Sequence, residues 1–303
     1  MNDEPMNDEV MQTITGRTEL LGLLAHPIRH SQSPRMHNLA IARLGLDYAY
    51  LAFEVDDESS GASMELPAAV EAMRTLKVRG WNVSMPNKMR ILTCVDTITP
   101  AAELIGASNT VVNEDGRLTA YNTDGVGAME ALRFFDHAPE GRTITIIGAG
   151  GAGTAVTVQA ALDGAAALNI FNRRDPFWDN AERTLEKISS RTGAAAVLHD
   201  LADQDALAGA LAESSVLIDA TNVGMGALEG RTNLPDVSII PPETFVMHVV
   251  YSPAETRFLR DCGRAGLQCT NGIEMMYRQG AAAFELFTGH DMPLDYVRAH
   301  MGR

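Results

Sequence analysis

Residues 143–153 read TITIIGAGGAG and decide the fold of the second half of the chain. A short apolar run, typical of a buried strand, leads directly into Gly148-x-Gly150-x-x-Gly153, and the helical sequence TAVTVQAAL follows. Gly148 permits a tight turn, Gly150 lets backbone N–H groups reach a pyrophosphate, and Gly153 lets the helix pack closely against the sheet. The pattern therefore predicts a dinucleotide-binding loop, and a close-packed structural turn is the alternative interpretation.

The sequence around this loop alternates apolar strands with helical stretches. We expect strands over residues 143–148, 168–172, 195–199, 216–221 and 244–251. Strands that are apolar along their whole length and are separated by helices are typical of a parallel sheet covered on both faces. The fold class is therefore α/β, and residues 124–272 are predicted to form a Rossmann-type, doubly wound dinucleotide-binding domain.

The first 123 residues also alternate strands and helices, with polar connections where the strands end. The expected elements are strands over 19–25, 48–55 and 78–85, helices over 33–44 and 65–76, and a hairpin over 109–123 around Asp115-Gly116. Ser33 is expected to be the N-cap of the first helix, Pro34 its first helical residue and Gly45 its end. Two helical stretches, 272–287 and 293–301, close the chain. We predict an N-terminal α/β domain formed by residues 18–123 together with 273–303.

Composition limits the classes of function. The 303 residues carry a net charge of −15, which argues against binding of a nucleic-acid backbone. No apolar run approaches the roughly 18 residues needed to cross a membrane. The three cysteines, Cys94, Cys262 and Cys269, lack metal-ligand spacing, so we expect reduced thiols, no metal and a cytoplasmic location. The acidic opening MNDEPMNDEV predicts a disordered tail over residues 1–17.

The strand after the glycine loop ends in FNRRD, residues 171–175. Asn172 stands where an acid commonly holds the adenosine ribose of NAD. Arg173 and Arg174 could instead clamp the 2′-phosphate of NADP, and Asp175 could hold the ribose hydroxyls of NAD. The stretch thus allows NAD, NADP or both, and a solvated turn is the alternative.

Polar side chains at strand ends are candidates for substrate chemistry. Oxidation of a secondary alcohol needs a group that takes the hydroxyl proton and a partner that orients it. Lys88 and Asp124 could serve as this pair. Four further polar residues also stand where strands or hairpins of the first domain end: Ser31, Ser33, Ser84 and Asn109. Each also has a structural interpretation: Ser33 as a helix cap, Thr123 or Asp124 as another cap, Lys88 as an exposed lysine and Asn109 as a turn residue.

Seven segments, in this order and at these separations, resemble the shikimate dehydrogenase family: HSQSP, NVSMPNK, GASNT, YNTDGVG, GAGGAG, VVYSPAET and GIEMMYRQGA. The chain is most similar to the quinate/shikimate dehydrogenase branch, which accepts NAD or NADP, in RHSQSP, VSMPNK, FNRRD, DLADQ, NVGM and TGHDMPLDYV. The resemblance runs from about residue 19 to residue 301. It implies reversible NAD(P)-dependent hydride transfer at the C3 hydroxyl of shikimate or quinate, in aromatic amino-acid biosynthesis or quinate use. It also implies that the N-terminal domain binds the substrate.

The resemblance further implies a role for individual residues. Lys88 and Asp124 match the catalytic pair. The residues that match substrate contacts are Ser31, Ser33, Ser84, Asn109, Tyr251 and Gln279. Those that match cofactor contacts are Gly148, Ala149, Gly150, Gly151, Ala152, Gly153, Asn172, Arg173, Arg174, Asp175, Asn222, Val249, Val250, Tyr251, Ser252 and Gly272. We expect a homodimer with a small-molecule substrate and no nucleic-acid or membrane partner.

Three positions depart from the family pattern. His248 and Asn271 stand where many members carry an acid, and Asn222 stands where close relatives carry Lys. The alternatives are a paralogue acting on another ring acid such as aminoshikimate, a nucleotide-sensing regulator without turnover, and a dehydrogenase of amino acids or folates. The balance between quinate and shikimate stays open, because a few pocket contacts worth about 1–3 kcal/mol decide it.

Overall fold

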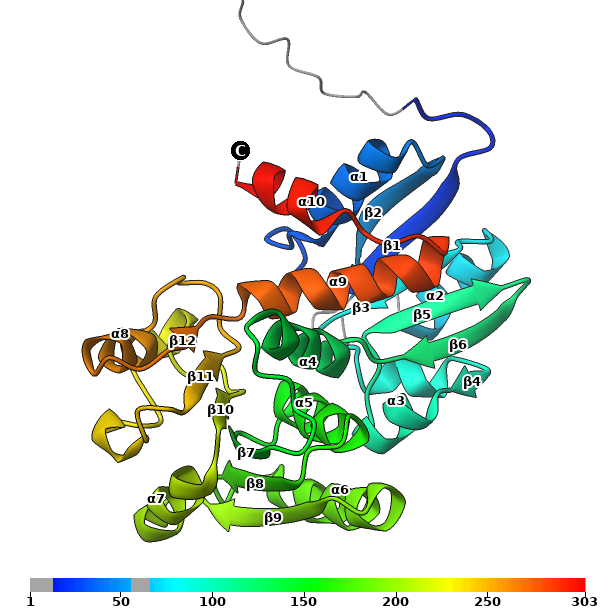
Figure 1. Ribbon diagram of the computed structural model, residues 1–303. Helices are drawn as coiled ribbons and strands as arrows, with labels where there is room; N and C mark the ends of the chain where they lie inside the picture. The colour runs from blue at the N-terminus through cyan, green and yellow to red at the C-terminus, as the bar shows by residue number, and fades with distance from the viewer. Residues whose placement is uncertain (1–12, 56–65, 303) are drawn as a thin grey trace, which may run out of the picture. The chain divides into compact units, whose positions relative to one another are not determined.

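The structure is a computed structural model and describes residues 13–55 and 66–302. The predicted tail over 1–17 lies mostly outside these residues. Internal contacts divide the chain into two compact units. Unit 1 comprises residues 1–97, 109–120 and 283–303, and unit 2 comprises residues 98–108 and 121–282. Figure 1 labels the elements of both units.

Unit 1 is built on a sheet of six strands in the order β2-β1-β3-β5-β6-β4. Their bounds are β1 Glu19–Ala25, β2 Tyr48–Glu54, β3 Gly80–Val83, β4 Thr97–Ile98, β5 Thr110–Glu114 and β6 Arg117–Tyr121. β2 and β3 pair in parallel with β1, whereas β5 runs antiparallel to β3. The sheet is thus parallel in its first half, and the β5–β6 hairpin turns at Asp115-Gly116, as expected, where both residues have positive φ.

Successive side chains along each strand of unit 1 point to opposite faces of the sheet, so the core of this unit lies on both faces. Leu24, Trp81 and Val111 pack with Val70 and its neighbours on α2, Leu66–Thr75. The other elements of unit 1 are α1 Ser33–Leu44, the short 3₁₀ turn η1 Arg90–Thr93 and α10 Leu294–Met301. Burial of apolar side chains on both faces, each contributing about 1.5–3 kcal/mol, holds the helices to the sheet.

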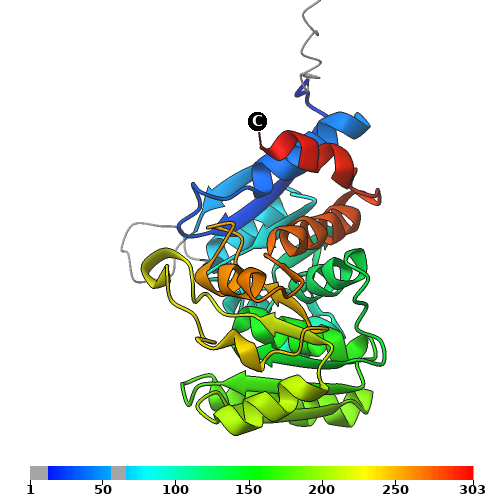
Figure 2. The ribbon, with the colours of Figure 1, turned by 60° about the vertical axis from the view of Figure 1, so that its left-hand side comes forward.

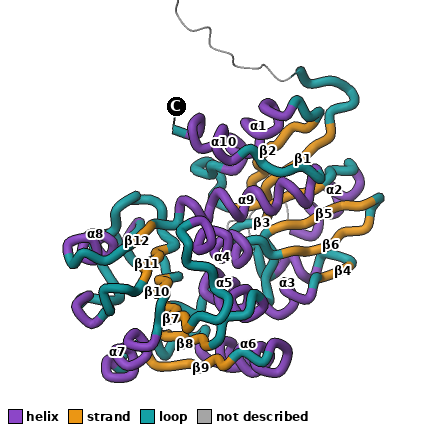
Figure 3. Tube along the Cα trace, in the orientation of Figure 1, coloured by secondary structure: helices purple, strands orange, loops and turns teal. Residues whose placement is uncertain are grey.

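Unit 2 contains a six-stranded sheet in the order β12-β11-β10-β7-β8-β9, and every pairing is parallel. The strands are β7 Thr143–Ile147, β8 Ala167–Asn172, β9 Ala195–Asp200, β10 Val216–Asp219, β11 Phe245–His248 and β12 Cys269–Thr270. The helical elements are α3 Pro100–Ile105, α4 Asp124–Phe134, α5 Gly151–Leu162, α6 Trp178–Thr192, α7 Gln204–Glu213, η2 Gly226–Leu228, η3 Val237–Ile239 and α8 Arg257–Arg264. The long helix α9, Ile273–Thr288, belongs to unit 2 as far as Ala282 and to unit 1 from Ala283 onward. The strand order is that of a Rossmann fold, so the predicted fold class is confirmed. Figure 3 separates these helices and strands by colour.

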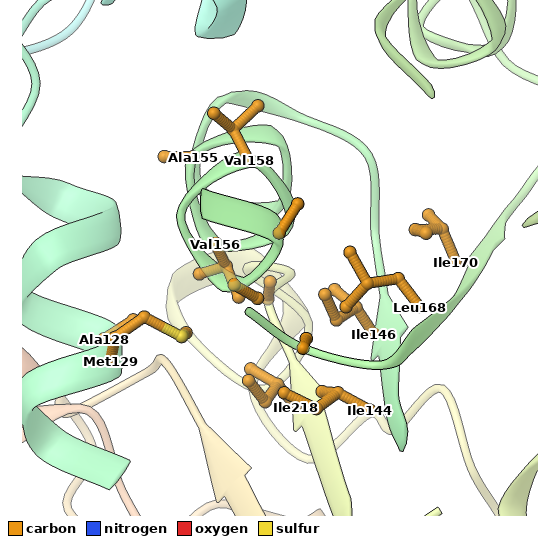
Figure 4. Packing of buried hydrophobic residues seen from close by; sticks show 14 of the residues in the cluster. Ala128, Met129, Ile144, Ile146, Ala155, Val156, Val158, Leu168, Ile170 and Ile218 are labelled. Atoms are coloured by element: carbon orange, nitrogen blue, oxygen red, sulfur yellow. The ribbon is translucent and has the colours of Figure 1, made fainter. Parts of the chain in front are cut away.

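Helices cover both faces of this second sheet (Figure 2). On one face, strand residues such as Ile146 and Ile170 belong to one buried cluster with Val156 of α5 and Met129 of α4; Figure 4 shows part of this cluster. On the other face, a second cluster joins alternate strand residues to α7 and α8; its members include Phe171, Leu207, Leu211, Leu217, Val246 and Phe258. The two-sided burial explains why these strands read as continuous apolar runs.

The structure corrects the predicted start of α1. The backbone carbonyl of Gln32 accepts the first helical hydrogen bond, from Met36 N–H at 3.0 Å, so Gln32 is the N-cap and Ser33 the first helical residue. The predicted strand over 216–221 ends early at Asp219, because Thr221 N–H donates to the Asp219 Oδ1 atom at 3.0 Å and turns the chain. The short elements β4, α3 and β12 were not expected from the sequence.

Candidate active site

The carboxyl ends of β1 and β3 lie at one edge of the unit 1 sheet, because the two strands are parallel. His26 N–H donates to Met85 O and Ser84 N–H donates to Leu24 O, both at 3.0 Å, so the loops that follow the two strands lie side by side. β5 begins at the same edge, where the carbonyl of Asn109 accepts a 2.8 Å bond from the last residue of β3. This edge gathers five of the predicted site residues: Ser31, Ser33, Ser84, Lys88 and Asn109.

Lys88 is carried by a turn that its neighbour anchors. Asn87 is fully buried, and its Nδ2 atom donates to Val55 O at 2.9 Å. The backbone N–H of Asn87 donates to Ser84 O, and its carbonyl accepts a bond from Ile91 N–H, both at 2.9 Å. Three hydrogen bonds therefore fix the residue immediately before Lys88, whose own side chain is half-buried.

Ser31 and Ser33 stand at the start of α1. Ser31 Oγ accepts a hydrogen bond from Ser33 N–H at 3.3 Å, and both side chains are half-buried. Two hydroxyls beside the N-terminus of a twelve-residue helix suit a carboxylate, because both the helix dipole and the hydroxyl protons favour negative charge there.

The glycine loop of unit 2 has room for a phosphate group. Gly148 has a φ of 101°, which favours glycine, and a Cβ at Gly153 would lie 1.9 Å from Gly148 O. Gly150 and Gly151 have no atom within 4 Å of an added Cβ, so the space beside them is open. Because α5 begins at Gly151, its first N–H groups border that space, and the loop fits a dinucleotide pyrophosphate.

Asn172 connects the glycine loop to the turn after β8. Its Oδ1 atom accepts a bond from Ala149 N–H at 3.1 Å. Its Nδ2 atom donates to Arg173 O at 2.9 Å and to Asp175 Oδ1 at 3.0 Å. A carboxylate could not donate these two bonds, so the amide at position 172 is matched to its surroundings.

Arg174 is ordered by an aromatic partner. Its guanidinium lies 3.7 Å from the centre of the Trp178 ring, and its Nε atom is 3.3 Å from Asp200 Oδ2. The side chain nevertheless keeps about two-thirds of its surface exposed. Stacking on an aromatic ring therefore presents a planar cation to solvent beside the end of β8.

Asp124 is the first residue of α4, and Asn122 fixes it. Asn122 Oδ1 accepts a bond from Asp124 N–H at 3.0 Å, and its Nδ2 donates to Ala107 O at 3.0 Å. Thr123 occupies the N-cap position and makes no capping bond with its side chain. The backbone at the start of α4 is thus held by Asn122, a residue for which the sequence suggested no role.

Gln279 lies where α9 passes close to α4. A Cβ added to Gly127 would be 2.6 Å from the backbone nitrogen of Gln279, so only glycine allows this approach of the two helices. The Gln279 side chain donates to Met276 O at 3.1 Å and is half-buried.

His248 and Asn271, two of the residues that differ from the family pattern, make different contacts in the structure. His248 is fully buried at the end of β11, with its Nδ1 atom 3.0 Å from Thr256 Oγ1. Burial lowers the pKa of His248, and the nearby charge of Asp219 opposes that effect. Asn271 donates through Nδ2 to Ala254 O at 2.9 Å, a bond that the family's usual carboxylate could not make.

The remaining predicted cofactor residues follow β10 and β11 at the same edge of the sheet as the glycine loop. They are Asn222, Val249, Val250, Tyr251 and Ser252, and Gly272 packs against them with its Cβ position 1.9 Å from Val249 O. Sequence reasoning did not single out the residues that hydrogen-bond to or stack on the predicted site residues, namely Asn82 and Thr110 beside Asn109, Asn122 beside Asp124, and Trp178 beside Arg174. Within residues 13–55 and 66–302, His, Cys, Asp and Glu form no group of three that could hold a metal, and no helix has the length and apolar content to cross a bilayer.

A parallel sheet in Rossmann order with an open glycine loop, and a second α/β unit carrying hydroxyl, amide and ammonium groups at a strand edge, define the class of two-domain dinucleotide-dependent oxidoreductases. Residues 23–111 match the shikimate dehydrogenase substrate binding domain, and residues 272–301 match the shikimate 5′-dehydrogenase C-terminal domain. The chain belongs to the shikimate dehydrogenase family.

Individual relatives agree with this assignment. The shikimate dehydrogenase (NADP⁺) of Listeria monocytogenes is 51% identical over 293 residues, which cover 97% of this chain and 99% of the relative. The quinate/shikimate dehydrogenase of Escherichia coli is 44% identical, over 95% of this chain and 98% of the relative. The crystal structure of shikimate 5-dehydrogenase from Listeria monocytogenes in complex with shikimate and NAD superimposes with a TM-score of 0.90 and covers 96% of this chain and 99% of that chain.

Proposed function

We propose that the protein catalyses reversible, NAD(P)-dependent oxidation of the C3 hydroxyl of shikimate, and of quinate as a second substrate. Residues 18–123 and 273–303 bind the ring acid, and residues 124–272 bind the dinucleotide. The observation that carries the proposal is the gathering of Ser31, Ser33, Ser84, Lys88 and Asn109 at one edge of the unit 1 sheet. The extent of identity with shikimate dehydrogenases, 51% across nearly the whole chain, supports it.

In this proposal the substrate carboxylate is held by the hydroxyls of Ser31 and Ser33 at the N-terminus of α1. Lys88 takes the proton from the C3 hydroxyl during oxidation and returns it during reduction, and Asp124 assists that transfer. Ser84, Asn109, Tyr251 and Gln279 orient the ring. When bound, the nicotinamide dinucleotide accepts the hydride that leaves C3.

We also propose that both NAD and NADP are used. In this proposal Arg173 and Arg174 bind the 2′-phosphate of NADP, and Asp175 accepts hydrogen bonds from the free ribose hydroxyls of NAD. The Asp175 Oδ1 atom already accepts bonds from Asn172 and from Phe177 N–H at 2.9 Å, so only the other carboxylate oxygen would serve the ribose. The exposed, stacked Arg174 therefore favours NADP.

Initial rates with shikimate and quinate, each with NAD⁺ and NADP⁺, test the proposal. We expect turnover of shikimate with both cofactors, faster at low concentration with NADP⁺, and slower turnover of quinate. Folded protein that binds cofactor and oxidises neither acid would refute it and would direct the search to another ring acid. Sedimentation velocity would test the expected homodimer.

A further inference from the structure

Four buried polar side chains form a continuous chain of hydrogen bonds across unit 1: Tyr50, Asn82, Thr110 and Asn109. Asn82 and Thr110 are direct partners across β3 and β5, and Tyr50 and Asn82 flank alternate residues of β1. Their side chains therefore point to the same face of the sheet. None of the four is more than 7% exposed.

The orientation of the Asn82 amide follows from one backbone group. A carbonyl oxygen can only accept, so the Asn82 atom 3.1 Å from Asn109 O is the Nδ2 donor. The same Nδ2 lies 3.0 Å from Thr110 Oγ1 and donates to it. Oδ1 of Asn82 therefore faces the Tyr50 hydroxyl at 2.7 Å, and the tyrosine is the donor in that bond.

The direction of the next bond is then determined. Thr110 accepts from Asn82, so its single hydroxyl proton is directed to the Asn109 side chain at 2.9 Å. The Asn109 atom that faces Thr110 is consequently the Oδ1 acceptor. The Nδ2 donor is the other polar atom of the same amide, so fixing Oδ1 on Thr110 also fixes the orientation of Nδ2.

We propose that Thr110 is a positioning residue that locks the Asn109 amide so that its Nδ2 donates to a ring hydroxyl oxygen of the substrate. The inference rests on the proposed function. Asn82 and Tyr50 support it by giving the Thr110 hydroxyl its direction. Burial raises the pKa of Tyr50 well above its ordinary value, so its hydroxyl remains a donor throughout the pH range of an assay.

Thr110→Val tests this inference, because it removes the hydroxyl at nearly constant shape and releases the amide. Loss of one directed hydrogen bond is expected to raise the KM for shikimate about tenfold, with the kcat and the cofactor KM nearly unchanged. Thr110→Ser keeps the donor and should restore the wild-type KM. The matched control is Thr145→Val, a buried strand threonine of unit 2 whose hydroxyl lies 2.8 Å from Ser214 Oγ, and it should leave the KM for shikimate unchanged.

Two further measurements separate positioning from general damage. Tyr50→Phe should raise the KM less than Thr110→Val does, because the Asn109 carbonyl still orients Asn82. With shikimate analogues that lack the 4- or the 5-hydroxyl, the KM ratio of Thr110→Val to wild type should fall to one for the analogue that has lost the contacted oxygen. Thr110→Cys, a weak donor of similar size, replaces the valine variant if that variant does not fold.

A wild-type KM in Thr110→Val, or a raised KM that Thr110→Ser does not restore, would overturn the positioning role while leaving the proposed function in place. Absence of shikimate turnover by the wild-type enzyme with either cofactor would instead overturn the proposed function, and the substrate role of Asn109 with it. The first two results concern the variants alone, so the two failures are distinguishable.

Discussion

A Cβ atom at Gly153 would lie 1.9 Å from the carbonyl oxygen of Gly148. The start of α5 and the end of β7 are therefore in backbone contact, and no side chain fits between them. This contact brings the first N–H groups of α5 to the carboxyl end of the strand, where a pyrophosphate would bind.

Gly153→Ala should therefore weaken dinucleotide binding, because the loop must move to accommodate the new methyl group. We expect the cofactor Kd to rise at least tenfold and the free energy of unfolding to fall by about 1–3 kcal/mol. Fluorescence titration and urea denaturation would measure the two effects. Gly209→Ala is the control: this exposed residue of α7 has open space around it, so alanine should stabilise the helix by about 0.5–1 kcal/mol and leave the Kd unchanged. Equal Kd values for wild type and Gly153→Ala would exclude the pyrophosphate role of this loop.

Lys88→Ala and Asp124→Asn should lower kcat for shikimate oxidation about 10²–10⁴-fold, since each removes a group assigned to proton transfer. Cofactor binding should persist, because neither residue belongs to the glycine loop. Steady-state kinetics and a cofactor titration would check both points, with the exposed Lys187→Ala of α6 as the control for loss of a lysine charge. Near-wild-type turnover in either variant would remove that residue from the catalytic pair.

Arg174→Ala should raise the KM for NADP⁺ about tenfold and leave that for NAD⁺ nearly constant, because hydrogen bonds to charged groups contribute about 1.5–3 kcal/mol and only NADP carries the 2′-phosphate. Trp178→Leu should have a smaller effect in the same direction, since it removes the ring on which the guanidinium stacks but leaves the guanidinium itself in place. The exposed Arg183→Ala on α6 controls for net charge. An equal change in both KM values would show that Arg174 supports the fold of the turn and does not select the cofactor.

His37 should make the protein less stable in acid. The ring is fully buried, stacks on Tyr50 at 4.3 Å, and has no hydrogen-bond partner for either nitrogen among the described residues. Burial lowers the pKa of His37 from 6.5 to about 3. The unfolded chain therefore binds a proton below pH 6.5 that the folded protein refuses, and stability falls as the pH drops from 6.5 toward 3.

His37→Phe should remove this penalty, which amounts to about 2 kcal/mol at pH 5. Urea denaturation at pH 8 and pH 5 would show a smaller loss of stability in the variant than in the wild type. Some acid sensitivity should remain, because burial also lowers the pKa of His248. The exposed His290→Gln is the control and should behave as the wild type. Identical pH dependence in His37→Phe would contradict the assignment of a neutral buried ring.

The sheets could be predicted because their signal is local. Glu19–Ala25 and Thr143–Ile147 are buried strands flanked by turn residues, and the glycine spacing after Ile147 has one common structural use. The predicted bounds of helices and strands were wrong where a single hydrogen bond determines the residue at which an element begins or ends. Serine is a common N-cap residue, so the sequence favours Ser33 at this position. In the structure the Gln32 carbonyl accepts the first helical hydrogen bond, and residue type alone does not predict this.

The support of the site could not be predicted in this way. Tyr50, Asn82 and Thr110 are separated by 32 and 28 residues, and only the strand order of the sheet places them in one chain. From the sequence, Trp178 is expected to be an apolar residue of a helix, and only the structure shows that its ring stacks on the guanidinium of Arg174. Long-range pairing therefore determines which polar side chains assist the residues that the family motifs point to.

The division of the chain into units also sets an order of events during synthesis. Unit 2 ends at Ala282, whereas unit 1 needs the last segment, from Ala283 onward. Phe287 in that segment packs where a Cβ on Gly80 would be, 2.4 Å from its ring. Every strand of the unit 2 sheet therefore leaves the ribosome before unit 1 has the segment that completes its core. Unit 1 contains the strands that are synthesised first, yet its core is completed after that of unit 2, so we expect β1 to β3 to be open to pairing with other chains until Phe287 has been synthesised.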